Sequence, residues 1–260
     1  MSTTNISMGV GNDQIYLAGM PLFSGDENEL KNALQSMINS DRQHLIVTAN
    51  VDQAIDLADS ASLYKAYERA SLRLVDGMPL IVLARLLGVK NLPRHTGADL
   101  LPTAAAWSMK YGWRVAIVGG AAEIGAKAAI LLCEKYPGSN ISHIDFPVVS
   151  DVTAEACGAV AYSLRELDPD IVFICLGSPK QEKWMDHWSE HLPSAVFVGA
   201  GAAVDFAAGA KSRAPKSVQV LGLEWVWRLA QEPRRLAGRY LLKGPKFLLI
   251  VRNSLSGARK

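Results

Sequence analysis

The sequence predicts an α/β fold, in which a mostly parallel β-sheet carries helices on both faces and is followed by a basic helical C-terminal appendage. Short β-rich runs alternate with longer helical periods from Ile15 to Val198, a pattern typical of parallel sheets. Beyond Arg213 the β-rich runs cease and the chain becomes helical and basic. These two observations argue against an all-α or all-β fold.

The strands are expected where β-branched, aromatic and other apolar residues cluster between turn residues. Each of these runs is short enough for a strand rather than a helix. The expected strands are Ile15–Leu17, His44–Thr48, Leu72–Val75, Arg114–Val118, Ile141–Phe146, Ile171–Leu176 and Ala195–Val198.

Helical periods fill the segments between the strands, and Pro137 and Pro193 stand just after two of them, where helix stop signals belong. The expected helices include Val51–Ala70, Ala98–Tyr111, Glu123–Tyr136, Thr153–Leu167 and Gln181–His191. The change near Pro215 predicts a boundary. We expect a disordered N-terminus (1–14), a globular body (15–212) and an appendage (213–260).

The appendage is strongly basic, although the formal net charge of the chain is only +2. Residues 211–260 carry twelve Lys or Arg and two acids, so the rest of the chain is net negative. Such asymmetry indicates a partner rich in phosphate or an anionic membrane surface, where each basic group contributes about 1 kcal/mol. A solvated helical face is the alternative. The apolar residues Phe247, Ile250, Val251 and Leu255 follow helical spacing, as in an interfacial helix.

Several classes of protein are disfavoured by the composition. No run approaches the about 18 to 20 apolar residues that a membrane-spanning helix requires. The polar N-terminus lacks the basic start and apolar stretch of a signal peptide, so we expect it to be cytoplasmic. Cys133, Cys157 and Cys175 have no CxxC spacing, which argues against a disulfide framework or a zinc knuckle.

Open parallel sheets bind their ligands beyond the carboxyl ends of the strands. Four segments follow predicted strands directly and carry polar residues or glycine. They are Thr48-Ala49-Asn50, Asp76-Gly77-Met78-Pro79, Gly119-Gly120 and Gly177-Ser178-Pro179-Lys180-Gln181-Glu182.

Asp76 is the candidate general base. A carboxylate directly after a strand lies at the ligand edge and can accept a proton from an attacking hydroxyl group. The alternative is that Asp76 caps the helix that begins near Pro79, a role that Asp fills well.

Gly119 and Gly120 precede a predicted helix and form a turn that lets the backbone approach phosphates at the helix N-terminus. The alternative is a close-packed turn without a ligand. The GxGxxG dinucleotide pattern is not satisfied, because residue 121 is Ala. Asp145 follows near the end of the next strand, where such an acid holds a ribose hydroxyl in nicotinamide enzymes. A nicotinamide-dependent oxidoreductase therefore stays open.

Lys180 and Gln181 open a helix after a strand and supply a cation and an amide suited to diphosphate or sugar hydroxyls. Alternatively, they are surface residues of a first helical turn. Asp205 follows another glycine turn, Gly199-Ala200-Gly201, and either contacts a ligand or braces the turn; we favour bracing.

Two patterns that resemble metal sites are expected at the wrong edge of the sheet. His187-Trp188-Ser189-Glu190-His191 matches HxxEH, but these residues end a helix that begins at the ligand edge. Asp168-Pro169-Asp170 resembles a DxD signature, but it precedes its strand. No metal is therefore expected.

Six motifs in chain order, within about Ile15–Tyr240, resemble the WecG/TagA/CpsF family of bacterial glycosyltransferases (glycosyltransferase family 26). They are Thr48-Ala49-Asn50, Asp76-Gly77-Met78-Pro79, Arg94 with Gly97-Ala98-Asp99-Leu100, Gly177-Ser178-Pro179-Lys180-Gln181-Glu182, Arg213-Ala214-Pro215 and Gly222-Leu223-Glu224-Trp225. The resemblance implies a Rossmann-like body that transfers a sugar, with inversion, from a UDP-sugar to a monosaccharide carried on polyprenyl diphosphate.

The resemblance also implies a location and an appendage. Family members work at the cytoplasmic face of the plasma membrane in surface-polysaccharide synthesis, need no metal or cofactor beyond the UDP-sugar donor, and dock through a C-terminal appendage that helps to close the site.

The resemblance implies particular site residues as well. Asp76 takes the place of the base, Thr48, Asn50 and Arg94 line the pocket, and Gln181 matches the family's glutamine. The arginines implied to approach the diphosphate are Arg228, Arg235 and Arg239.

A third reading is a nucleic-acid-binding module, for which the tail offers Trp225, Trp227 and Tyr240. The acidic body and the lack of a nucleic-acid-binding motif argue against it. The sequence does not show whether glucose, N-acetylmannosamine or its uronic acid is transferred. A homo-oligomer also stays open.

Overall fold

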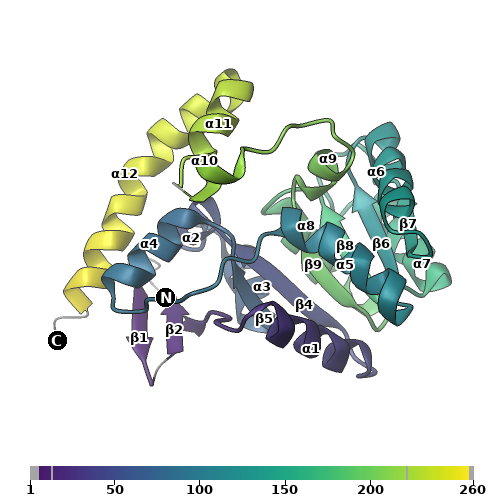
Figure 1. Cartoon of the computed structure of the whole chain (residues 1–260), viewed down its shortest axis with the longest axis horizontal. Coiled ribbons are helices and arrows are strands. Elements are labelled where there is room, and N and C mark those ends of the chain that lie inside the picture. The colour runs from purple at the N-terminus through teal and green to yellow at the C-terminus, as the bar shows by residue number, and fades with distance from the viewer. Residues whose placement is uncertain (1–5, 13, 221, 258–260) are drawn as a thin grey trace.

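The computed structural model describes residues 6–12, 14–220 and 222–257 (Figure 1). A six-stranded parallel sheet lies at the centre, in the order β5-β4-β9-β8-β6-β7. Its strands are β4 (His44–Ala49), β5 (Leu72–Val75), β6 (Arg114–Gly119), β7 (Asn140–Ile144), β8 (Ile171–Cys175) and β9 (Val196–Gly199). The predicted α/β fold class is confirmed.

Alternate residues of each strand pack against different helix layers, as the pleat requires. In β6, Val115 and Ile117 enter one apolar cluster, whereas Ala116 and Val118 enter another. The first layer contains α1 (Glu27–Ile38), α5 (Gly97–Tyr111), α6 (Ala122–Lys135) and α9 (Ala203–Ala207). The second contains α2 (Val51–Asp56), α3 (Ala61–Arg69), α7 (Gly158–Leu167) and α8 (Lys180–His187).

Some predicted helices are divided or shorter than expected. The predicted helix Val51–Ala70 is two helices, α2 and α3, because the Ser60 side chain accepts a hydrogen bond from the Leu63 N–H and starts a new helix. The predicted helix Gln181–His191 ends at His187 and continues as a 3₁₀ turn, Ser189–His191.

The prediction that residues 1–14 are disordered was wrong for residues 8–11, which form a strand. β1 (Met8–Gly11), β2 (Gln14–Leu17) and β3 (Met20–Pro21) form a separate antiparallel sheet. Residues 8–11 are therefore ordered, and the predicted strand Ile15–Leu17 does not join the parallel sheet. Met8 and Ile15 are almost fully buried in a cluster shared with α2, α3 and α4 (Met78–Leu86), which explains the order.

The C-terminal segment is helical, as predicted, but its long helix packs on the body. It comprises α10 (Lys216–Val220), α11 (Glu224–Gln231) and α12 (Pro233–Gly257). Figure 1 shows α12 (yellow) running back past α2 and β1, with which it is in contact. The Met8 N–H donates to Ser254 Oγ (2.8 Å), which joins the two ends of the chain.

The apolar side of α12 that we expected to face a membrane faces the core instead. Ile250 is only 5% exposed, and Phe247 and Val251 pack against the same cluster. Leu248 and Leu249 are the exposed apolar residues of this stretch. The division of the chain at residue 213 stays a prediction, but α12 and β1 share one core. No helix of the described ranges is long and apolar enough to cross a membrane.

Candidate active site

The carboxyl ends of the parallel strands bring the predicted site segments to one edge. β4 and β5 are neighbours, so Asn50 and Asp76 begin adjacent turns. The Asp76 N–H donates to the Ala49 carbonyl (2.8 Å). A Cβ atom on Gly77 would lie 3.3 Å from the Asn50 Cα, so a glycine at this position lets the two turns pack closely.

Arg94 holds Asp76 in place. Its Nε donates to the Asp76 carbonyl (2.6 Å), and its terminal nitrogen lies 3.6 Å from the Asp76 carboxylate. The same nitrogen donates to Glu224 at the start of α11 (2.6 Å). Arg94 therefore connects Asp76, the candidate base, to the appendage. The sequence motifs included Arg94, Asp76 and Glu224 but did not show that these residues are in contact.

Asp76 does not cap α4, and that alternative was wrong. The N-cap of α4 is Gly77, the residue after Asp76. The Asp76 side chain is about one-quarter exposed at the sheet edge.

Thr48 and Asn50 shape the turns at this edge. The buried Thr48 hydroxyl donates to the Gly199 carbonyl (2.9 Å), which ties β4 to the turn after β9. The Asn50 Oδ1 accepts a hydrogen bond from the Gln53 N–H (3.1 Å), so Asn50 is the N-cap of α2. It is half-buried and stays at the sheet edge.

Gly119 and Gly120 form a turn that requires glycine. Their φ angles are +90° and +82°, and a Cβ atom on Gly119 would lie 2.7 Å from Leu176. α6 follows at Ala122 and has no side-chain N-cap. Backbone amides at a helix N-terminus attract anions such as phosphate.

Lys180 and Gln181 have different surroundings, although they are adjacent. Lys180 is exposed, and its Nζ donates to the Val149 carbonyl (3.3 Å). Gln181 is 2% exposed. Its amide donates to Glu182 (2.9 Å), and its carbonyl oxygen accepts the Gly201 N–H (3.1 Å). Gln181 therefore lies in a buried hydrogen-bond network and is not a first-turn surface residue.

Asp205 braces the segment that leads to the appendage. Lys211 lies 2.9 Å from the Asp205 carboxylate and 3.1 Å from that of Glu232, just before α12. Arg213 pairs with Asp99 and also donates to Thr96 Oγ1 (3.2 Å). Burial alone would raise the pKa of Asp99, but hydrogen bonds from Arg213 and Thr96 outweigh it and lower that pKa.

The predicted diphosphate arginines lie on the appendage helices. Arg228 belongs to α11, and Arg235 and Arg239 belong to α12. Their side chains lie outside the described part of the structure, so their roles stay predictions.

The two metal-like patterns lie away from Asp76. Asp168 and Asp170 pair with Arg114 at the amino end of β6 (2.8 and 2.9 Å). His187 ends α8, and His191 lies in the following 3₁₀ turn. Within residues 6–12, 14–220 and 222–257, no three His, Cys, Asp or Glu side chains are grouped to hold a metal ion.

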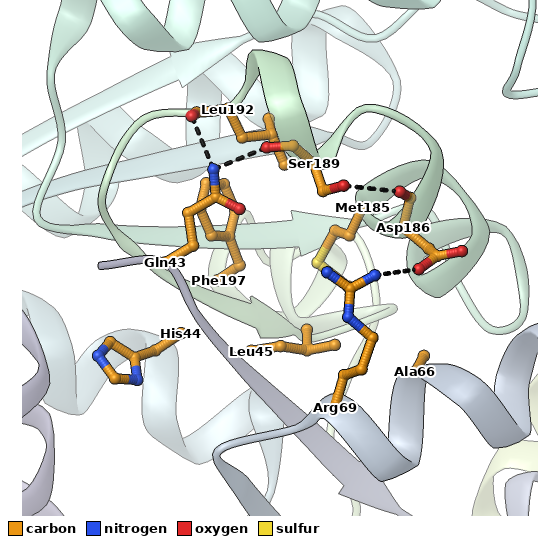
Figure 2. A pocket seen from close by; sticks show the side chains of 10 residues that line it. All are labelled: Gln43, His44, Leu45, Ala66, Arg69, Met185, Asp186, Ser189, Leu192 and Phe197. Carbon is orange, nitrogen blue, oxygen red and sulfur yellow. Dashed lines mark hydrogen bonds and ion pairs between the residues drawn. The ribbon is translucent and has the colours of Figure 1, made fainter.

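A hollow at the opposite end of β4 is not part of this site (Figure 2). It begins at His44, the first residue of β4, and lies against α3 and α8. Gln43 donates to the Ser189 and Leu192 carbonyls, and Arg69 pairs with Asp186 (2.5 Å). These polar groups are paired within the protein.

Comparison with known proteins identifies similar chains. The family model described as "Glycosyl transferase WecG/TagA/CpsF family" matches residues 15–260. One similar protein is the N-acetylglucosaminyldiphosphoundecaprenol N-acetyl-beta-D-mannosaminyltransferase of Bacillus subtilis (strain 168). It is 27% identical over 207 residues, which cover 80% of this chain and 78% of the relative. These matches do not support the nicotinamide alternative.

Proposed function

Because the chain belongs to the WecG/TagA/CpsF family of glycosyltransferases, we propose that it transfers a hexose-type sugar from a UDP-sugar to a monosaccharide on polyprenyl diphosphate. The name of the Bacillus subtilis relative supports N-acetylmannosamine as the donor sugar and N-acetylglucosamine as the acceptor sugar. The product belongs to the synthesis of a cell-surface polysaccharide.

In this proposal Asp76 is the general base. Its carboxylate removes the proton from the acceptor hydroxyl, the alkoxide attacks the anomeric carbon from the side opposite UDP, and the configuration inverts. Arg94 fixes the carboxylate by binding both the backbone and the side chain of Asp76. A positioned base of this kind contributes about 10²- to 10⁴-fold to the rate.

Fixed positive groups hold the departing UDP without a metal ion. The Gly119-Gly120 turn and the uncapped start of α6 offer backbone amides to the diphosphate, and Lys180 adds a cation at the same edge. Arg228, Arg235 and Arg239 complete the charge when the appendage covers the nucleotide. Preorganised donors of this kind stabilise the charge that develops in the transition state.

The proposal depends on one observation: a carboxylate at the carboxyl edge of a parallel sheet is joined through Arg94 to Glu224 at the start of α11 in the appendage. The sugar groups would lie between Asp76 and the turns that Thr48, Asn50 and Gln181 shape. For Asp205 the proposal favours a bracing role, since its carboxylate lies 2.9 Å from Lys211.

Product analysis with a panel of donors tests this function. We expect UDP-N-acetylmannosamine, UDP-glucose or UDP-N-acetylmannosaminuronic acid to extend a short-chain polyprenyl-diphosphate N-acetylglucosamine, as measured by mass spectrometry. UDP should raise the melting temperature, because a ligand of the native state stabilises it, and NADH should not. A shift with NADH and no product with any donor would reject the proposal.

The membrane contact that we propose uses the exposed side of α12, at the cytoplasmic face of the plasma membrane. Leu248 and Leu249 are 67% and 55% exposed. Pro245 and Arg252 share their helical face, because the spacings are three and four residues. Lys243 and Lys246 pair with acids of the body. An apolar strip with a basic edge suits an anionic bilayer.

Replacing both Leu248 and Leu249 with Ser should weaken binding to anionic vesicles at least about tenfold. Full burial of a leucine side chain contributes about 1.5–3 kcal/mol of favourable free energy, and insertion into the membrane interface contributes part of this amount. The melting temperature should stay unchanged, since exposed substitutions usually change stability by less than about 0.5 kcal/mol. Vesicle co-sedimentation measures the effect. Ile130→Ser is the matched control, since Ile130 is an exposed apolar residue on α6. Equal binding by both variants would contradict the proposed face.

A further inference from the structure

Five hydrogen bonds, together with the backbone segments 48–50 and 199–201 that connect them, form a closed ring next to the candidate active site. Asn50 accepts from the Gln53 N–H, and the Gln53 side-chain amide donates to Glu182 Oε1 (3.2 Å). Glu182 Oε1 also accepts from Gln181, which in turn binds the Gly201 N–H.

The ring returns to its starting strand through the turn after β9. Thr48, two residues before Asn50, donates to the Gly199 carbonyl. A Cβ atom on Gly199 would lie 2.6 Å from the Gln181 amide nitrogen. Glycine at this position therefore leaves room for the Gln181 side chain. The ring therefore fixes the ends of β4 and β9 relative to each other, and Glu182 joins its two halves.

Glu182 is an unusual residue for this position because it is completely buried (0% exposed). One oxygen accepts two amides, whereas in the described part of the chain the other oxygen, Oε2, has no hydrogen-bond partner of normal geometry. The Ser178 hydroxyl is also buried without such a partner and lies close enough to interact with this carboxyl group. A proton on Oε2 would give this oxygen a donor hydrogen beside Ser178.

We propose that Glu182 is a positioning residue for sugar transfer, acting as a neutral carboxylic acid that holds the turns bearing Thr48, Asn50 and Gln181 in their reactive arrangement. This inference rests on the proposed function. In this proposal Glu182 does not contact the substrate. It acts through its hydrogen bonds with the side chains of Gln181 and Gln53.

The surroundings of Glu182 favour the neutral acid. Burial raises the pKa of Glu182, and it outweighs the hydrogen bonds from Gln181, the Glu182 backbone N–H, Ser178 and Gln53, all of which lower that pKa. The ionisable group that faces the ring from α3 is Tyr67, whose hydroxyl donates to Gln53 (2.9 Å). Burial, Glu182 and Asp76 raise the pKa of Tyr67, whereas Arg73 lowers it. Arg73 itself donates to the Tyr67 and Glu68 carbonyls.

The activity test compares two substitutions of Glu182 in the full-length protein. Glu182→Gln keeps an acceptor oxygen and a polar hydrogen and should retain kcat within about threefold. Glu182→Leu removes the acceptor and should lower kcat about 10- to 100-fold with a smaller change in KM, because displaced catalytic groups slow the reaction. Gln53→Met breaks the ring on the other side of the carboxyl group and should reproduce this loss if Glu182→Leu fails to fold. Glu166→Gln, on the exposed side of α7, is the matched control.

A pH series supplies a second measurement that does not need activity. An acid whose pKa is raised on folding binds its proton more tightly in the native state, so stability falls as pH rises from the unfolded pKa through the folded pKa. The melting temperature of the wild type should therefore fall relative to that of Glu182→Gln as pH rises from about 4.5, near the unfolded pKa of Glu.

The outcomes separate the two proposals. If Glu182→Gln loses as much activity as Glu182→Leu, or if its melting temperature parallels that of the wild type at all pH values, Glu182 is not a neutral positioning acid. If the wild type transfers no sugar, the proposed function and the positioning role both fail, while the pH series still decides whether Glu182 is protonated.

Discussion

Replacing Asp76 with Asn is expected to lower sugar transfer by about 10²- to 10⁴-fold, the range that a positioned general base contributes. The amide has nearly the same shape as the carboxylate, so it can fill the same space beside Arg94, but it cannot accept the hydroxyl proton. Arg94 keeps its contacts with Glu224 and with the Asp76 backbone carbonyl, since neither involves the substituted group. Initial rates at saturating donor and acceptor measure the effect.

Donor binding supplies the first control for this substitution. The UDP-induced rise in melting temperature should be the same in Asp76→Asn and the wild type, because the amides and cations proposed to hold UDP lie elsewhere. Asp145→Asn is the matched variant: Asp145 follows β7 at the same edge of the sheet and is 69% exposed. A normal rate in Asp76→Asn, or an equal loss in Asp145→Asn, would remove Asp76 from the mechanism.

The parallel sheet could be predicted because each of its strands carries its own local signal. β8 is a run of five buried apolar residues, and the polar pair Asp168 and Asp170 and the glycine Gly177 mark its limits. A segment buried on both faces must be continuously apolar, so the sequence shows its position directly. The site edge followed from the strands, since the carboxyl ends of parallel strands coincide.

The N-terminal strand could not be predicted, because the contacts that order it come from distant parts of the chain. β1 is four residues long and includes two glycines, so its local signal is weak. Its order depends on β2 and on α12, where Ser254 accepts the Met8 N–H from 246 residues away. A local sequence pattern does not indicate a partner this far away in the chain.

The orientation of α12 was missed for a different reason. The helix has apolar residues on two sides, one containing Ile250 and the other containing Leu248 and Leu249. Helical spacing is the same for both sides, so periodicity does not decide which one meets the body.

The basic charge of the appendage was attributed to an external partner, yet part of it is matched within the chain. Lys243 pairs with Asp56 (2.6 Å), and Lys246 pairs with Asp59 (3.0 Å). A net charge counted along the sequence does not distinguish such pairs from a surface that attracts lipid.

The hydrogen-bond ring around Glu182 could not be predicted from the sequence either, because its members come from separate segments of the chain. Glu182 stood in a recognised motif, but a glutamate in a first helical turn is ordinarily exposed. Gln53 carried one local signal, a polar side chain beside the buried residues Ala54 and Ile55 of a short helix. The partner of each residue becomes evident only in the folded chain, where the Gln53 amide on α2 donates to Glu182 on α8.

Removing residues 213–260 is expected to lower both stability and activity, because the appendage contributes to the body core as well as to the site. Ile250 is buried in the cluster that contains β1 and β2, and truncating a buried side chain of this size costs about 2–5 kcal/mol. In a chain of this length 1 kcal/mol corresponds to about 2–4 °C, so the melting temperature should fall by at least about 5 °C. Differential scanning calorimetry measures it.

The activity of the truncated chain should fall at least about 10²-fold even below its melting temperature, since loss of one preorganised donor to the developing charge costs about 10²- to 10³-fold. Ile250→Ala in the full chain separates the two effects. It should reproduce part of the loss in melting temperature and keep most of the transfer rate, whereas the adjacent Leu249→Ala should leave the melting temperature unchanged. An unaltered melting temperature after truncation would contradict the shared core, and an unaltered rate would show that the appendage arginines take no part in transfer.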